Sequence, residues 1–422
     1  MQNIKIKANL SETAYTTRET CRVCNSGKLE FVLSLGMHYV SNFVKKEDIS
    51  KGAKAPLELV LCQNCSLLQL KHTAPQELLY SGFYWYKSGV TETMRKALRD
   101  ITKTVERLFR LKKGDVVLDI GSNDGTLLRT YSIPGLVKVG VEPATNLTEE
   151  GQKGLDHFIH GFWNYKSYIK TAKKKAKVIT AIGMFYDMED PNQFIADVVK
   201  ALDNDGVFIA QLMCLKNMLD TNDVGNICHE HLEYYSFASL EFLFNRNGLE
   251  IFDVEINNVN GGSYRIYSRL KGSKLETNGG MERVKKTRND EKYLQDKKAY
   301  TDFFKRIEEN KKKCVDFIRK EAKKGKKIWV YGASTKGNTI LQYYELNSKT
   351  IAAAAEKASW KWGKYTIGSM IPIVSEEEAR KANPDYFLLL PYAFLNEFLE
   401  REKDWMKKGG KFIIPLPEFR II

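Results

Sequence analysis

Four of the seven cysteines form two equally spaced pairs, Cys21-Arg-Val-Cys24 and Cys62-Gln-Asn-Cys65. A two-residue spacer lets both thiolates of a pair bind one tetrahedral ion, and two pairs complete a four-cysteine zinc site. The alternative is disulfide bonds, which the absence of an apolar signal core at the start of the chain disfavours. We expect a zinc ion bound by Cys21, Cys24, Cys62 and Cys65. Because all four positions are thiolates, its role would be structural.

Two of the six histidines flank a carboxylate in Cys228-His229-Glu230-His231. Alternate residues of an extended segment share a side, so His229 and His231 are expected to project together. A histidine beside a carboxylate is a suitable general base. The alternative is a pair of satisfied polar residues that anchor a loop. Further along the chain, polar residues that would supply hydrogen bonds to a substrate are Asn260, Ser263 and Arg265.

The stretch Asp115-Val-Val-Leu-Asp-Ile-Gly-Ser-Asn-Asp-Gly-Thr predicts a buried strand, a glycine turn and a helix start. It lacks the third glycine of a dinucleotide fingerprint and the lysine of a Walker loop. Glu142, at the end of the next predicted strand, can accept hydrogen bonds from both hydroxyls of a ribose. This combination indicates S-adenosylmethionine, and a plain packing turn is the alternative. The expected cofactor residues are Asp119, Gly121, Asn123, Asp124, Gly125, Glu142 and Met184.

A second glycine turn, Gly332-Ala-Ser-Thr-Lys-Gly-Asn, follows another predicted strand. Its serine has the wrong spacing for a nucleophile elbow. A phosphate-binding loop at a helix N-terminus and a packing turn are equally compatible with it. In the first case Lys336 and Asn338 would contact the substrate.

Alternating strands and helices surround these motifs. Strands are expected at 116–120, 137–141, 176–181 and 206–211, with helices between them, which predicts a parallel sheet covered on both faces. We therefore expect an α/β protein with a zinc-binding N-terminal domain (residues 1–75) and a larger α/β domain (residues 76–270), which the family resemblance described below implies is a Rossmann-like class I methyltransferase domain. A helical connector and a smaller α/β substrate-binding domain would occupy residues 271–422.

The composition describes a globular protein with one unusual number, a formal charge of +14 over 422 residues. Residues 271–330 carry 20 Lys and Arg against 10 Asp and Glu, and residues 166–177 carry six Lys and no acid. Apolar residues recur through the first of these segments at helical spacing, so its charge is expected on a solvated helix face. We accordingly expect no nucleic-acid partner. No apolar run approaches the ~18 residues of a membrane span, which favours a cytoplasmic protein, either monomeric or a homo-oligomer.

The order of these motifs resembles a known family, the sugar C-methyltransferases of deoxysugar biosynthesis. The motifs are the two Cys-x2-Cys pairs, G-S-N-D-G-T-L-L, G-V-E-P, H-E-H-L-x-Y-Y-S, N-G-G-S-x-R and G-A-x-x-K-G-N, and they cover nearly the whole chain. The resemblance implies methyl transfer from S-adenosylmethionine to the carbon beside the ketone, C3, of a nucleotide-linked 4-keto-6-deoxy sugar.

By the same resemblance, His231 is the base, Glu230 its neighbouring carboxylate, and Tyr84 and Tyr86 the phenols that reach the sugar. Two departures stand out. Cys228 occupies a position where many members have tyrosine, and Ile182-Gly-Met-Phe-Tyr-Asp187 replaces an N-N-V-x-A-H stretch. A tyrosine hydroxyl and a histidine of the family pattern are therefore missing, which leaves the particular sugar and the methylated position open.

Other functions are compatible with parts of this pattern. An O- or N-methyltransferase would use the same cofactor site and the same histidine, without needing a ketone. A zinc-containing nucleic-acid methyltransferase or binding module would fit the cysteines and the charge, but the chain has no N-P-P-Y-type motif for exocyclic amines. A non-catalytic scaffold is disfavoured by the intact Gly121, Gly125, Glu142 and His231.

Overall fold

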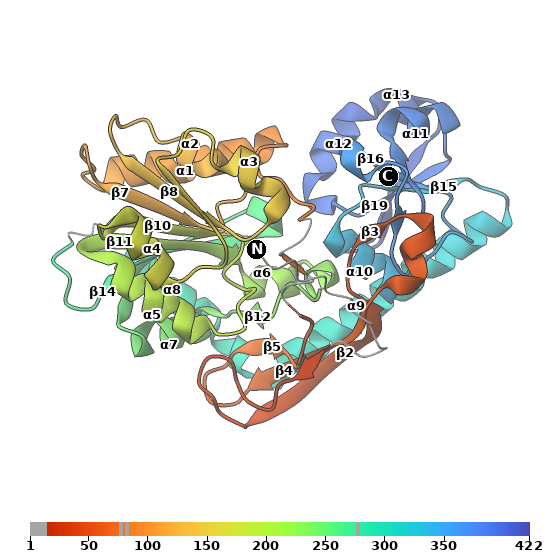
Figure 1. Cartoon of the computed structure of the whole chain (residues 1–422). Coiled ribbons are helices and arrows are strands. Elements are labelled where there is room, and N and C mark those ends of the chain that lie inside the picture. Colours follow the sequence, from red (N-terminus) through yellow and green to blue (C-terminus); the bar gives the residue numbers. More distant parts are fainter. Residues whose placement is uncertain (1–14, 76–78, 81–83, 276–278) are drawn as a thin grey trace.

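The computed structural model describes residues 15–75, 79–80, 84–275 and 279–422. It contains three main β-sheets (Figure 1). The largest lies on the left of the view with its helices, and a second α/β unit lies at the upper right. The sheet of the N-terminal segment lies below both of them. The mixed α/β class expected from the sequence is confirmed.

The largest sheet has seven strands in the order β13-β14-β11-β10-β7-β8-β9. Its pairs are parallel except at β14, which runs antiparallel to both neighbours. The expected alternation of strands and helices around a parallel sheet is thus confirmed. The strands are β7 (Val116–Ile120), β8 (Val137–Glu142), β9 (His157–His160), β10 (Ala176–Ile182), β11 (Leu202–Met213), β13 (Leu249–Asn257) and β14 (Ser263–Leu270).

Helices cover both faces of this sheet, because its central strands are buried on both sides. Val117 of β7 packs with Leu98 and Val105 of the first helix, whereas its neighbour Leu118 belongs to the core on the opposite face, with Val198. The alternation follows from the two-residue period of a strand. The helices are α1 (Glu92–Leu108), α2 (Thr126–Arg129), α3 (Thr148–Gly151), α4 (Tyr165–Ala172), α5 (Pro191–Ala201), α6 (Leu215–Asp220) and α7 (Phe237–Arg246).

The N-terminal segment forms an antiparallel sheet that is completed by a strand from much later in the chain. Its order is β12-β5-β4-β2, and β12 (Glu233–Tyr234) directly follows the His229–His231 motif. A short strand of the same segment, β3 (Phe43–Val44), pairs with β17 (Tyr365–Thr366). The segment is therefore joined by strand pairing to both α/β units. Its other strands are β1 (Thr16–Thr17), β2 (Leu29–Tyr39), β4 (Lys54–Cys62), β5 (Leu68–Leu70) and β6 (His72–Thr73).

The C-terminal unit is built on a six-stranded sheet in the order β18-β16-β15-β19-β20-β21, parallel except for β21. Tyr331, Phe387, Trp405 and Phe412 fill the core on one of its faces. The strands are β15 (Ile328–Tyr331), β16 (Ala354–Glu356), β18 (Ile373–Ser375), β19 (Tyr386–Leu389), β20 (Lys411–Ile414) and β21 (Arg420–Ile421). The helices are α10 (Thr335–Tyr343), α11 (Glu376–Ala382), α12 (Leu395–Arg401) and α13 (Lys403–Lys407).

The basic connector is helical, with α8 (Met281–Asp290) followed by α9 (Lys297–Lys323). Along α9 the apolar side chains are buried, including Tyr300, Ile307, Cys314 and Ile318. The lysines and arginines between them lie mostly on the exposed face. No helix in the described part of the chain is long and apolar enough to cross a membrane.

Candidate active site and zinc centre

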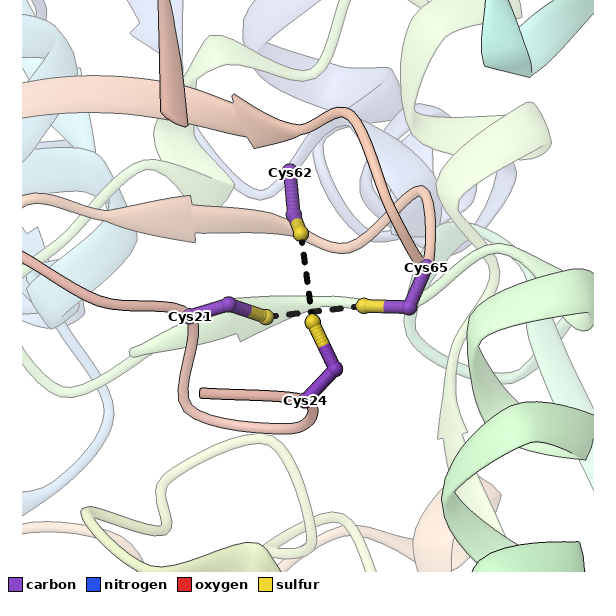
Figure 2. A group of neighbouring side chains, drawn as sticks. All are labelled: Cys21, Cys24, Cys62 and Cys65. Atoms are coloured by element: carbon purple, nitrogen blue, oxygen red, sulfur yellow. Dashed lines mark hydrogen bonds between the residues drawn. The ribbon is translucent and has the colours of Figure 1, made fainter. Parts of the chain in front are cut away.

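The four paired cysteines converge on one point (Figure 2). Their sulfur atoms all lie within 4.8 Å of one another, with Cys21 and Cys65 3.5 Å apart and Cys24 and Cys62 3.4 Å apart. Zinc–sulfur bonds of ~2.3 Å place the sulfurs of a tetrahedron roughly 3.8 Å apart, so the arrangement fits zinc. With four thiolates as ligands the site is structural, as the sequence predicted.

The backbone explains why each pair can bind one ion. Both loops turn tightly after the first cysteine: Asn25 N–H donates to the carbonyl of Cys21, and Ser66 N–H donates to that of Cys62. Asn25 and Ser66 both adopt a left-handed conformation, with φ of 59°. The two turns bring the second cysteine of each pair back toward the first.

A cavity of about 350 Å³ opens at the carboxyl ends of β7, β8 and β10, which is where ligands bind in open α/β sheets. We call it the glycine-loop cavity. Gly121 lies at its floor with φ of +69°, and a Cβ atom there would come within 2.8 Å of Met184 Cγ. Of the predicted cofactor residues, four line this cavity: Gly121, Asn123, Glu142 and Met184.

The Glu142 carboxylate is held in place by two backbone amides. The N–H of Asn123 donates to one oxygen and the N–H of Ala144 to the other, both at 2.9 Å. Burial raises the pKa of Glu142, while the two amides lower it. A carboxylate oriented in this way, at the end of the second strand, is placed to accept hydrogen bonds from a ribose.

The other three predicted cofactor residues, Asp119, Asp124 and Gly125, do not line the cavity but stabilise the glycine turn that does. Asp124 accepts hydrogen bonds from Thr126 and from the N–H of Gly89, and Asp119 accepts one from Thr180 at 2.6 Å. Burial raises the pKa of Asp119 to about 7. Gly125 has φ of +77° and precedes α2. The sequence also missed cavity residues that have no motif of their own, namely Tyr80, Ser88, Phe162 and Trp163.

A second cavity, of about 820 Å³, lies beside the first, and we call it the histidine cavity because His231 lines it. Its walls come from the N-terminal segment, the seven-stranded unit and the C-terminal unit. Of the residues that the structure describes, four line both cavities: Tyr84, Tyr86, Gly183 and Asp187. A group transferred from one cavity to the other would pass at this junction.

One ring nitrogen of His231 is hydrogen-bonded to the backbone, which fixes the tautomer of the ring. Its Nδ1 lies 2.9 Å from the carbonyl of Asn226, and since a carbonyl only accepts, Nδ1 carries the proton. The neutral ring therefore has its lone pair on Nε2. The ring packs edge-on against Tyr186, with centroids 4.5 Å apart. Burial, with the nearby charge of Lys336, lowers the pKa of His231 to about 3.

The two histidines of the motif do not project together, contrary to the prediction. His229 is buried against the N-terminal sheet, where its Nε2 lies 3.0 Å from the carbonyl of Ala55, and it does not line the histidine cavity. The segment is a turn rather than a strand, so the two-residue alternation does not apply. Glu230 does line the cavity beside His231, and burial raises the pKa of its carboxyl.

Tyr84 and Tyr86, which the family resemblance implies reach the sugar, both lie at the junction of the two cavities. Their backbone is fixed to the glycine loop and its neighbours: Tyr84 N–H donates to Asn146 Oδ1 at 2.8 Å, and the Asn123 side chain donates to the carbonyl of Tyr86 at 3.1 Å. Burial raises the pKa of both phenols, that of Tyr86 to about 12. Both phenols are therefore hydrogen-bond donors at neutral pH.

The three polar residues of the N-G-G-S-x-R motif lie outside both cavities. The Arg265 guanidinium donates to Gln211 and pairs with Asp100, each at 2.9 Å. Ser263 donates to the carbonyl of Val259, and Asn260 adopts a left-handed conformation in the turn before β14. Their contacts stabilise the antiparallel edge of the large sheet. The structure therefore does not bring these three residues to the cavities, where the predicted contact with the substrate would require them.

The second glycine turn is close to the histidine cavity, although Lys336 and Asn338 do not line it. Ser334 caps α10 by accepting from Gly337 N–H, and Ser334 and Thr335 line the cavity. Lys336 is near enough for its charge to lower the pKa of His231. Asn338 is buried and accepts a hydrogen bond from Ser369, away from the cavity.

One wall of the histidine cavity, which we call its outer wall, is formed by lysines and aromatic residues. No sequence motif predicted it. Several of its cations lie over aromatic rings: Lys87 is 5.3 Å from the Trp360 ring centre, and Lys364 is 5.6 Å from that of Trp85. The residues come from three distant parts of the chain, and they are Phe43, Lys45, Lys51, Trp85, Lys87, Trp360, Lys361 and Lys364.

Three family models match consecutive parts of the chain. A putative zinc-binding domain matches residues 21–80, a methyltransferase domain residues 91–254, and a C-methyltransferase C-terminal domain residues 258–417. A relative from Streptomyces niveus, the C-methyltransferase NovU, is 30% identical over 409 residues, which cover 96% of this chain and 97% of the relative.

Two solved methyltransferase structures each match less than half of this chain. One is a magnesium protoporphyrin IX methyltransferase from Synechocystis PCC 6803 with bound SAH (TM-score 0.33, 11% identity, 44% of this chain and 90% of that chain). Another is an S-adenosylmethionine-dependent methyltransferase from Clostridium acetobutylicum (TM-score 0.33, 13% identity, 43% and 93%). By its match to NovU along almost its whole length, the chain belongs to the zinc-containing, S-adenosylmethionine-dependent C-methyltransferases.

Proposed function

We propose that the protein methylates the carbon next to the ketone, C3, of a nucleotide-linked 4-keto-deoxysugar. The observation that supports the proposal is the junction of the two cavities: His231 lines one, four of the expected cofactor residues line the other, and the two share part of their lining. S-adenosylmethionine supplies an electrophilic methyl group. Residues of this chain would position the sugar and move its proton.

The nucleotide end of such a substrate suits the outer wall of the histidine cavity. A diphosphate is an anion that lysines and a helix N-terminus stabilise. Lys45, Lys87 and Lys364 line this wall, and the N-terminus of α10 opens on it through Ser334 and Thr335. The aromatic side chains Trp85 and Trp360 offer apolar surface to a nucleobase or sugar ring.

The reaction needs a base for the proton at C3. A carbon beside a ketone becomes acidic once the enolate oxygen is stabilised, and Nε2 of His231 carries the lone pair that would accept the proton. The phenols of Tyr84 and Tyr86 would donate hydrogen bonds toward the sugar. Holding the base, the carbon and the methyl donor in one line then lowers the barrier.

The test is solvent deuterium exchange at C3 of an NDP-4-keto-6-deoxy sugar with S-adenosylhomocysteine bound, together with methyl transfer when S-adenosylmethionine is supplied. We expect the parent protein to catalyse both, and His231→Asn to lose both by at least ~100-fold. His229→Asn is the matched control, because its ring lies outside the cavity. Equal rates for His231→Asn and the parent would show that another group is the base. Methylation of the 4-hydroxy sugar in place of the ketone would refute the proposed function.

A further inference from the structure

Asp187 occupies the point where the two cavities meet. It lies in the turn after β10 and is only 7% exposed. Among the four residues that line both cavities, it is the one with a carboxyl group. If the carbon that receives the methyl group lies at this junction, between the methyl donor and His231, the carbonyl oxygen on the neighbouring carbon lies there too.

The position of Asp187 is fixed by its neighbours on both sides. Its own N–H donates to the carbonyl of Met184 at 3.1 Å, which closes the turn after β10. The carbonyl of the preceding Tyr186 accepts from the N–H groups of Leu232 and Glu233, at 2.8 and 3.0 Å. These bonds tie the turn to the segment that carries Glu230 and His231. These backbone bonds therefore fix the position of Asp187 at the junction.

The charges that face Asp187 favour its neutral form. Burial raises its pKa well above the usual range, and the nearby carboxyls of Glu230 and Glu233 raise it further. A hydrogen bond with Tyr80 and the charge of Lys336 act in the opposite direction without cancelling the effect. The Tyr80 hydroxyl donates its proton to the backbone carbonyl of Glu230 at 2.9 Å, which holds Tyr80 beside this segment. A buried, protonated carboxylic acid is a hydrogen-bond donor.

We infer that Asp187 is a catalytic residue that acts as a neutral carboxylic acid and donates a hydrogen bond to the substrate carbonyl oxygen as it becomes an enolate. The inference rests on the proposed function. His231 takes the C3 proton, and the C–H electron pair moves toward the oxygen that Asp187 stabilises. The pair then returns to form the new carbon–carbon bond as the methyl–sulfur bond breaks. Asp187 keeps its proton throughout and supplies a donor at the position where this chain lacks the family's histidine.

Glu230 is less suited to this role. It lines the histidine cavity only, whereas Asp187 borders the cofactor space as well. Tyr84 and Tyr86 share the junction and would add donors, so the enolate would be held by more than one group. The two phenols are donors at neutral pH in any case, whereas the carboxyl group of Asp187 donates only when it is protonated. Substitution of Asp187 by Asn or Leu can therefore test its contribution separately.

Two substitutions at this position separate the possibilities. Asp187→Asn keeps a donor of similar shape, and Asp187→Leu removes it. We expect Asp187→Leu to slow both C3 exchange and methyl transfer by about 10²- to 10³-fold, the usual cost of one oxyanion donor, and Asp187→Asn to stay within about 10-fold of the parent. The affinity for S-adenosylhomocysteine, measured by calorimetry, should change little in either variant. Infrared difference spectra of parent minus Asp187→Asn should show the carbonyl band of a protonated carboxyl at pH 7.

Different outcomes refute different statements. If Asp187→Asn is as slow as Asp187→Leu, Asp187 acts in its ionised form and the inference is wrong. If Asp187→Leu exchanges at the parental rate, or the infrared band is absent, the inference is also wrong while the proposed function stands. If the parent itself exchanges no 4-keto sugar, the proposed function fails and this inference fails with it.

Discussion

The Arg22 guanidinium lies between two zinc-ligand cysteines in the sequence and contacts Glu189, a residue that lines the glycine-loop cavity. Two of its nitrogens lie 3.4 Å from the same carboxylate oxygen, and Thr73 joins them by donating to that oxygen at 2.9 Å. The Arg22 side chain is fully buried and also lies 3.9 Å from the buried carboxyl of Glu233. Through Arg22, the loop between Cys21 and Cys24 therefore contacts a wall of the glycine-loop cavity.

Replacing Arg22 should destabilise the whole molecule. Arg22→Ala leaves Glu233 buried without its cation and removes donors from Thr73 and the carbonyl of Leu70, so we expect a loss of ~3–5 kcal/mol in the free energy of unfolding. Urea denaturation measures this loss. Lys28→Ala, on the exposed surface of the same loop region, should stay within ~0.5 kcal/mol of the parent. A similar result for both variants would mean that Arg22 contributes no more than a surface residue.

Loss of the zinc should weaken cofactor binding as well as the fold. Cys62→Ser removes one of four thiolates, and the freed loop would no longer hold Arg22 against Glu189. We expect one zinc per chain in the parent by elemental analysis, a large loss in the variant, and weaker binding of S-adenosylhomocysteine by calorimetry. Cys314→Ala, buried on α9, should keep its zinc. Unchanged zinc content in Cys62→Ser would contradict the assigned ligand set.

The charge on Glu142 should matter more for the cofactor than for the fold. In Glu142→Gln the amide group cannot accept at both positions where Asn123 and Ala144 now donate, and the charged acceptor for the ribose is lost. We expect the dissociation constant of S-adenosylhomocysteine to rise about 10- to 100-fold, which corresponds to ~1.4–2.8 kcal/mol. Glu149→Gln, exposed on α3, serves as the control and should bind as the parent does.

Gly121 offers a test of close packing at the floor of the same cavity. Gly121→Ala adds a methyl group at 2.8 Å from Met184 Cγ in a left-handed backbone conformation. Gly114→Ala shares the positive φ, of +84°, but meets nothing within 4 Å. Both should cost about 1 kcal/mol of stability through the backbone, and only Gly121→Ala should also weaken cofactor binding. Equal binding by the two variants would show that Met184 moves aside freely.

His229 should give a pH-dependent contribution to stability. Its burial lowers the pKa from 6.5 to about 4, so the unfolded chain binds a proton that the folded protein does not. The contribution is complete above pH 6.5 and falls by ~1.4 kcal/mol per pH unit as the pH drops toward 4. Urea denaturation at pH 7, 6 and 5 should therefore show the advantage of the parent over His229→Gln shrinking with acidity. A pH-independent difference would mean that the ring is charged or exposed.

The sequence predicted those parts of the site whose function depends on a short segment with a particular backbone conformation. The two Cys-x2-Cys turns and the Gly121 loop are short segments whose function requires a particular backbone, so their spacing alone predicted where they lie. His231 was found in the same way, by its carboxylate neighbour. His229 was misplaced because the alternation rule assumes an extended backbone, and tertiary contact with Ala55 turns its ring the other way.

The rest depended on tertiary structure. The lysines and tryptophans of the histidine cavity come from three regions that are far apart in the sequence, and each looks like an ordinary surface residue on its own. Arg265 shows the reverse error: the sequence predicted that it contacts the substrate, yet its guanidinium is bound by Asp100 and Gln211 at the edge of the large sheet. In the sequence, Asp187 appeared only as the last residue of a stretch that departs from the family pattern. Its position between the two cavities is seen only in the structure.

The pairing of β3 with β17 bears on how the protein is made. Residues 43–44 leave the ribosome more than 300 residues before their strand partner at 365–366. All seven strands of the large sheet, and every described residue that lines its glycine-loop cavity, come before residue 271. The histidine cavity, by contrast, closes only when the C-terminal unit supplies Ser334, Trp360 and Lys364. Translation therefore produces the lining of the glycine-loop cavity before it produces the last part of the histidine cavity.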